Sequence, residues 1–130
     1  MAAVLPSLVL ILAAVGFIGF GAAYALRPDR MAALTDVTLP TPTARADFVA
    51  TYGGFQVGVG VFLLACAADA SWQKPGLWAV VAALGGFALF RAVAIVLHRG
   101  QVRPSLWFGL GLELCGLALA AAALGFLAPF

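Results

Sequence analysis

Four long apolar segments alternate with short polar ones along the chain, at residues 7–26, 48–68, 76–97 and 105–127. Each has close to the ~20 residues that a helix needs to cross the hydrocarbon core of a bilayer. Backbone polar groups cannot stay unpaired in lipid, and these continuous apolar runs lack the alternation of a β-barrel. The pattern therefore predicts an all-α membrane protein, a four-transmembrane-helix bundle that forms a single integral membrane domain over residues 1–130.

The composition excludes a water-soluble monomer and a nucleic-acid-binding protein. Hydrophobic residues make up 65% of the chain and charged residues 9%, against about 45–50% and roughly 25% in soluble domains. The formal net charge is only +2 and no basic stripe is present, so the electrostatic footprint of a nucleic-acid partner is missing. We expect membrane lipids to be the main surroundings of this protein.

The distribution of Lys and Arg predicts the orientation in the membrane. The first and third polar segments would share one side of the membrane, and the only basic residue on the other side is Lys74. The positive-inside rule then places the loop 27–47 and the loop 98–104 in the cytoplasm and both termini outside. The five basic residues on the cytoplasmic side are Arg27, Arg30, Arg45, Arg99 and Arg103.

A cleavable signal peptide is an alternative interpretation of the first span, because Ala23-Tyr24-Ala25 resembles a small-residue cleavage site. A signal peptide, however, has a basic region before its apolar stretch. No basic residue precedes this span, and Arg27 and Arg30 follow it. We therefore expect the first span to be kept as a transmembrane helix.

The first loop contains local helix signals but no catalytic motif. Residues 29–34, after Pro28, are predicted to form a helical turn, and Thr43 is predicted to cap the second long helix. The loop has no metal-ligand cluster, no glycine-rich phosphate loop and no nucleophile beside a base. We therefore expect no cofactor and no metal.

Pairs of small residues four positions apart predict where the helices pack, because helices in lipid associate where backbones approach closely. The pairs are Gly54 with Gly58, Ala82 with Gly86, and Gly116 with Ala120. Packing within one chain is the preferred interpretation, and contacts in a homo-oligomer are the alternative. Cys66 and Cys115 lie at different heights in their spans, too far apart for a disulfide, so we expect both thiols to be free.

A layer of polar residues is predicted in the cytoplasmic half of the membrane. Arg91 in the third span and Glu113 in the fourth are the only charges inside the spans, and they lie at similar depths by helical rise. Charges in a bilayer usually face the protein interior and pair, so we expect these two side chains to contact each other. Gly109 and Gly116 flank Glu113 and leave room for a side chain or a small ligand. The remaining members of the predicted layer are Tyr52 and Gln56, with Arg45 and His98 continuing it toward the cytoplasm.

Three interpretations of this layer remain open. In the first, the Arg91–Glu113 pair fixes the register of the helices. In the second, the layer is the floor of a cavity for a lipid headgroup, a quinone or a small anion. In the third, Glu113 takes part in proton-coupled transport. Small multidrug-type transporters also have four short helices and a membrane glutamate. In those proteins the glutamate is in the first helix, which has no charge here.

Four stretches of this sequence resemble a known family: residues 45–58 (RADFVATYGGFQVG), 89–92 (LFRA), 99–104 (RGQVRP) and 113–114 (EL). They are similar, in the same order, to motifs of a family of small bacterial membrane proteins of unknown function, distantly similar to the DoxX-like proteins. The resemblance implies a four-helix inner-membrane protein and brings no established activity. DoxX-like relatives are associated with quinone-linked sulfur chemistry and with larger redox assemblies.

The function that these observations favour is a non-enzymatic accessory protein that binds lipid, another hydrophobic ligand such as a quinone, or a subunit of a larger membrane complex. The alternative is a quinone- or redox-associated enzyme component. Tyr52 and Glu113 could act as base and acid, but such groups alone do not define a substrate.

The orientation is tested by a cysteine placed in the third loop. A thiol reagent that cannot cross the membrane should not label a Gln101→Cys variant in intact cells, because the Lys and Arg distribution places this loop in the cytoplasm. Labelling from the periplasmic side would overturn the predicted orientation.

Overall fold

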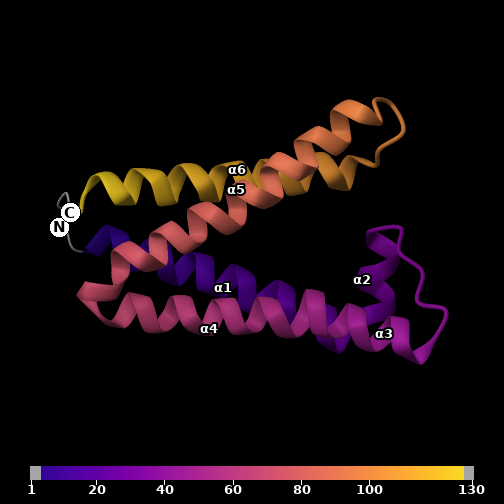
Figure 1. The fold of residues 1–130 in the computed structure, drawn as a ribbon, viewed down its shortest axis with the longest axis horizontal. Coiled ribbons are helices and arrows are strands. Elements are labelled where there is room, and N and C mark those ends of the chain that lie inside the picture. Colours follow the sequence, from indigo (N-terminus) through magenta and orange to yellow (C-terminus); the bar gives the residue numbers. More distant parts are fainter. Residues whose placement is uncertain (1–3, 128–130) are drawn as a thin grey trace. The chain divides into compact units, whose positions relative to one another are not determined.

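The computed structural model describes residues 4–127, and it contains helices and no strands over that range (Figure 1). Two short segments of other helical types interrupt the α-helices: the π-helical segment η1 (Val49–Gly54) and the 3₁₀ turn η2 (Ala70–Trp72). The α-helices are α1 (Val4–Leu26), α2 (Pro28–Leu34), α3 (Pro42–Phe48), α4 (Phe55–Ala68), α5 (Gln73–Leu97) and α6 (Pro104–Gly125).

Within residues 4–127, four helical segments are long and apolar enough to cross a membrane, which confirms the predicted fold class. They are Val4–Leu26, Pro42–Ala68, Ala70–Leu97 and Pro104–Gly125. The second begins six residues before the predicted start at Phe48, because α3, η1 and α4 follow one another without a break. The helical turn predicted after Pro28 is confirmed as α2.

The prediction that Thr43 caps the second span is wrong, since Thr41 is the capping residue. The hydroxyl of Thr41 accepts a hydrogen bond from the backbone N–H of Ala44 at 3.1 Å. Pro42 takes the first helical position, where its missing N–H costs nothing and its fixed φ favours the helix. The residue before this proline is therefore the cap.

By its internal contacts the chain divides into two compact units. Residues 11–65 form one unit, and the described residues 4–10 together with 66–127 belong to the other. Each unit includes part of α1 and part of α4, and each is described below by itself.

In the unit of residues 11–65, glycines bring α1 close to the segment that runs from η1 into α4. A Cβ added to Gly21 would lie 2.7 Å from the carbonyl oxygen of Gly53 and 2.9 Å from the backbone nitrogen of Val57. A Cβ added to Gly60 would lie 2.9 Å from the carbonyl oxygen of Ala14. The two backbones are thus in direct contact, as small residues allow in membrane helices.

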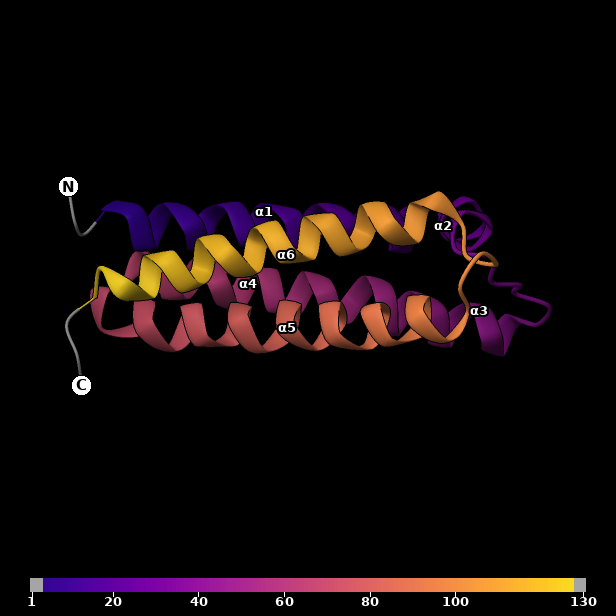
Figure 2. The same cartoon turned by 90° about the horizontal axis from the view of Figure 1, so that it is seen from above.

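In the other unit, α5 and α6 form a helical hairpin and lie side by side (Figures 1 and 2). The first turns of α1 are joined to the start of α5 by a hydrogen bond of 2.7 Å, in which the buried Gln73 amide donates to the Ser7 hydroxyl. Asp69 starts the adjacent turn η2. Its carboxylate accepts hydrogen bonds from the hydroxyl and the backbone N–H of Ser71, which hold the pKa of Asp69 below its ordinary value.

The structure changes which small residues form the packing faces. Gly54, Gly58 and Gly86 were predicted to pack, but a Cβ at any of them would meet no described atom of its own unit within 4 Å. The neighbouring Gly53 packs instead, because α1 comes closest to the second span one residue before the predicted Gly54. The pair of Gly116 and Ala120 on α6 is confirmed: Ala120 is fully buried, and a Cβ at Gly116 would lie 2.5 Å from Leu84 on α5.

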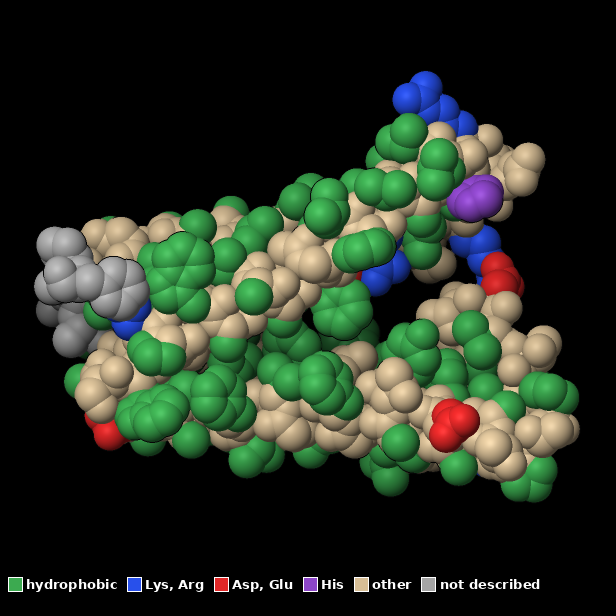
Figure 3. All heavy atoms as spheres, in the orientation of Figure 1, with side chains coloured by type: hydrophobic (Ala, Val, Ile, Leu, Met, Phe, Trp, Pro, Cys, Tyr) green, Lys and Arg blue, Asp and Glu red, His purple; other side chains and the backbone are tan. Residues whose placement is uncertain are grey.

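Hydrophobic side chains cover the helices on the face shown in Figure 3, as a lipid environment requires. The three tryptophans have about half of their surface exposed, and all lie near ends of helices or loops (Trp72, Trp78 and Trp107). This placement is typical of aromatic residues at a membrane interface.

The close approach of α1 to η1 is tested by an alanine at Gly21. The Gly21→Ala variant should unfold at a lower temperature in detergent, because its Cβ would clash with backbone atoms that cannot turn away; such overpacking costs about 1–3 kcal/mol. Gly19→Ala, on an exposed face of the same helix, is the matched control and should leave the melting temperature unchanged or slightly raised. Equal melting temperatures for the two variants would contradict the described packing.

Candidate functional site

The predicted contact between Arg91 and Glu113 is confirmed. Arg91 on α5 donates from Nε to both carboxylate oxygens of Glu113 on α6, at 3.0 and 2.9 Å, and from Nη2 to Oε1 at 2.7 Å. A guanidinium and a carboxylate that share several short hydrogen bonds form the strongest type of ion pair in proteins. This pair links the two helices of the hairpin inside their apolar segments.

The two side chains of the ion pair differ in exposure. The Glu113 side chain is 11% exposed and the Arg91 side chain 28%. The carboxylate is therefore enclosed by the protein, whereas about a quarter of the arginine surface can still be reached.

Gly109 provides the space in which the guanidinium lies. A Cβ at this position would lie 3.2 Å from Cζ, 3.3 Å from Nη1 and 3.4 Å from Nε of Arg91, so the guanidinium rests directly against the backbone of α6. The predicted room beside Glu113 is therefore filled by a neighbouring side chain at Gly109. Leu84 fills the corresponding space at Gly116.

Tyr52 and Gln56 lie in the unit of residues 11–65, and their membership of one layer with Arg91 and Glu113 stays a prediction. Tyr52, in η1, is one of three clustered aromatic rings: its centroid lies 5.5 Å from that of Tyr24 and 4.9 Å from that of Phe48. Tyr24 and Phe48 are 5.4 Å apart. Gln56 is partly buried in the first turn of α4.

The two residues predicted to continue the layer are both exposed, Arg45 near the start of the second membrane-length segment and His98 just after the third. Arg45 on α3 forms an ion pair with Asp29 on α2, and both side chains are exposed. His98 follows the last residue of α5, and its backbone N–H closes the final turn by donating to the carbonyl of Ala94 at 3.0 Å. His98 is also exposed.

The π-helical segment η1 was not predicted from the sequence. It covers Val49–Gly54 and includes Tyr52 and the Gly53 that packs against α1. Short π-helical segments inside α-helices often occur at functional sites. The adjacent glycines Gly53 and Gly54 were the available signal, because they weaken the α-helical preference at this point.

The described residues show no group of three or more His, Cys, Asp or Glu side chains that could hold a metal ion. The thiols of Cys66 and Cys115 are free; Cys66 is buried and Cys115 is exposed.

Four helices able to span a bilayer, two of them joined by an ion pair within their apolar lengths, define a multi-pass membrane protein. Residues 6–124 match the model of a family described as a domain of unknown function, DUF4345, and the chain belongs to this family. No curated protein and no solved structure gives a significant match. The family membership agrees with the unknown function implied by the sequence motifs, whereas the likeness to DoxX-like proteins stays a prediction.

The strength of the ion pair is tested by a double-mutant cycle in detergent. Arg91→Gln and Glu113→Gln should each lower the free energy of unfolding by up to about 3–5 kcal/mol, because each leaves a charge without its partner in a low-dielectric environment. The double variant should recover part of this loss.

The exposed ion pair of Arg45 and Asp29 provides the matched control. Arg45→Gln should cost at most about 1 kcal/mol, because surface ion pairs contribute little. If the two losses at Arg91 and Glu113 simply add in the double variant, the two residues act independently and the described contact does not stabilise the protein.

Proposed function

We propose that this protein is a non-enzymatic component of a bacterial inner membrane that binds a hydrophobic molecule with a polar head, either a lipid or a quinone, at the Arg91–Glu113 pair. In this proposal both termini lie outside and the pair lies in the cytoplasmic half of the bilayer. The observation that carries the proposal is the partial exposure of the Arg91 side chain, whose guanidinium is paired with Glu113 between two apolar helices.

The cost of placing charges in lipid supports a role for this pair beyond filling space. A charged side chain at the bilayer centre costs at least about 2.5–3.5 kcal/mol, so intramembrane charges usually mark functional sites. Glu113 neutralises Arg91 and orients its guanidinium, and Gly109 lets the group lie flat on α6. A planar donor held in this way is suited to a carbonyl or phosphate oxygen of a ligand head.

A purely structural role for the pair predicts a different response to ligands. In that case Arg91 and Glu113 would only hold the register of α5 and α6, and added lipids or quinones would stabilise the native protein and the Arg91 variants alike. The ligand-binding role requires that the stabilisation by a ligand depends on Arg91 itself.

A component of a quinone-linked redox assembly is the second candidate. The three clustered rings of Tyr24, Phe48 and Tyr52 favour it, because aromatic side chains stack on flat rings, and Tyr52 is 43% exposed. The distant likeness of the motifs to DoxX-like proteins points in the same direction. Proton-coupled transport by Glu113 has less support, since its carboxylate is enclosed and paired with Arg91.

Thermal unfolding in detergent with a short-chain ubiquinone, and separately with phosphatidylglycerol, tests the proposal. At least one of the two should raise the melting temperature of the native protein, because a ligand that binds only the folded state stabilises it. The effect should be lost in Arg91→Gln/Glu113→Gln, which removes both charges together, and kept in Arg45→Gln. The same shift in all three proteins, or no shift in any, would contradict the proposal.

A further inference from the structure

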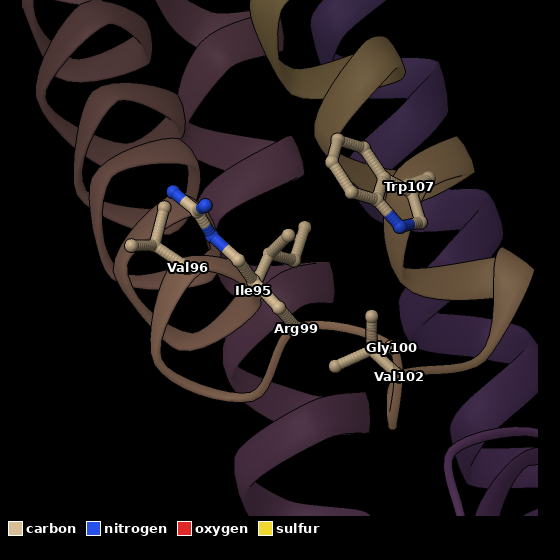
Figure 4. A pocket seen from close by; sticks show the side chains of 6 residues that line it. All are labelled: Ile95, Val96, Arg99, Gly100, Val102 and Trp107. Carbon is tan, nitrogen blue, oxygen red and sulfur yellow. The ribbon is translucent and has the colours of Figure 1, made fainter.

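We infer that the turn between α5 and α6 is a separate binding site for the phosphate headgroup of an anionic phospholipid, held by Arg99 with the start of its acyl chain beside Trp107. The site is a pocket of about 290 Å³. Its lining residues are Ile95, Val96, Arg99, Gly100, Val102 and Trp107 (Figure 4).

The walls of this pocket are almost entirely apolar, and Arg99 is the one charged residue among those that line it. Ile95 and Val96 come from the last turn of α5 and Trp107 comes from the first turn of α6. The Arg99 side chain extends from the loop beside Val96, and the indole of Trp107 faces this region from α6 (Figure 4). A tryptophan and an arginine at the end of a membrane helix are typical of the level of the lipid headgroups.

The backbone of the loop creates the pocket. Gly100 has a φ of +78°, a left-handed conformation that other residues rarely adopt, and it turns the chain sharply after α5. Val102 then completes the pocket between the ends of the two helices. The pocket is thus formed by consecutive elements of one hairpin.

The charges around the pocket favour an anionic ligand. Between Arg91 and Glu113 the sequence contains no acidic residue, while it contains His98, Arg99 and Arg103 in the turn. Arg99 is exposed, and within residues 4–127 its guanidinium has no ion-pair partner. Glu113 is already engaged by Arg91 and is enclosed.

The apolar walls favour a lipid over free phosphate. Free phosphate would interact favourably with Arg99, but it would make no favourable contact with the apolar side chains of Ile95, Val102 or Trp107. A phospholipid places its phosphate at the level of the interfacial arginine and its first methylenes against the apolar walls, so it uses both parts of the pocket. Juxtamembrane basic residues attract anionic lipids in this way.

This site is independent of the proposed function. By helical rise, Arg99 lies about 12 Å beyond Arg91 along the hairpin, and the two sites share no residue. Loss of the deeper ligand in Arg91→Gln/Glu113→Gln should therefore leave lipid binding at Arg99 unchanged. Failure of one proposal does not affect the other.

Fluorescence quenching by brominated lipids tests the inference in vesicles. A Trp72→Phe/Trp78→Phe variant keeps Trp107 as its only tryptophan. In vesicles of otherwise unlabelled phosphatidylcholine, brominated phosphatidylglycerol should quench Trp107 with about a fivefold higher apparent affinity than brominated phosphatidylcholine. This factor corresponds to about 1 kcal/mol for one arginine near the surface. Adding Arg99→Gln should bring the preference close to one, and Arg99→Lys should keep most of it.

Arg30→Gln, added to the same background, is the matched control, because it removes an exposed arginine of α2 and changes the net charge equally. It should leave the preference unchanged. Equal quenching by the two lipids, or an equal loss in the Arg30 and Arg99 variants, would overturn the inference. A preference abolished by inorganic phosphate, but not by chloride at equal ionic strength, would show that free phosphate rather than a lipid occupies the site.

Discussion

The ion pair between Arg91 and Glu113 constrains how α5 and α6 pack. An arginine and a glutamate within apolar helices must meet, because either one alone would leave a charge without a partner in a low-dielectric environment. Their meeting brings the guanidinium against α6, where Gly109 lets it lie directly on the backbone; a Cβ at this position would lie 3.2 Å from Cζ of Arg91. Further along the hairpin, Leu84 fills the space at Gly116. Charge pairing and close packing therefore favour the same register of the two helices.

The unit of residues 11–65 is held by close backbone contact instead of an ion pair within its spans. Gly21, Gly53 and Gly60 let α1 approach η1 and α4 to the distance of direct backbone contact. The π-helical segment lies where this approach is closest, and it also carries Tyr52 into the cluster with Tyr24 and Phe48. The end of this unit that contains α2 and α3 is polar, because it carries the exposed ion pair of Arg45 and Asp29.

The sequence predicted the number and type of the spans, and the contact of Arg91 with Glu113, because hydropathy and the cost of a charge in lipid leave few alternatives. The predictions failed where they rested on a single local residue or on residue types that are frequent throughout the chain. Thr43 was preferred to Thr41 as the cap, although Pro42 marks the first helical position. Glycine and alanine are so frequent that Gly54 and Gly58 matched a packing motif by chance. The adjacent Gly53 and Gly54 weaken the α-helical preference but do not specify a π-helical segment. The relation of Tyr52 and Gln56 to the ion pair depends on how the two units pack, which local patterns do not determine.

The pairing of Arg91 with Glu113 in the membrane can be measured directly, because Glu113 is the sole glutamate of the sequence. Protein labelled with ¹³C at the glutamate side-chain carboxyl and with ¹⁵N at the arginine side chains therefore contains a single carboxyl reporter. Solid-state NMR in lipid bilayers should show strong dipolar dephasing of this carbon by arginine nitrogens, as hydrogen bonds of 2.7 to 3.0 Å require, and the dephasing should vanish in Arg91→Gln. A carboxyl signal without dephasing in the native protein, or with equal dephasing in the variant, would show that Arg91 and Glu113 are not paired in the bilayer.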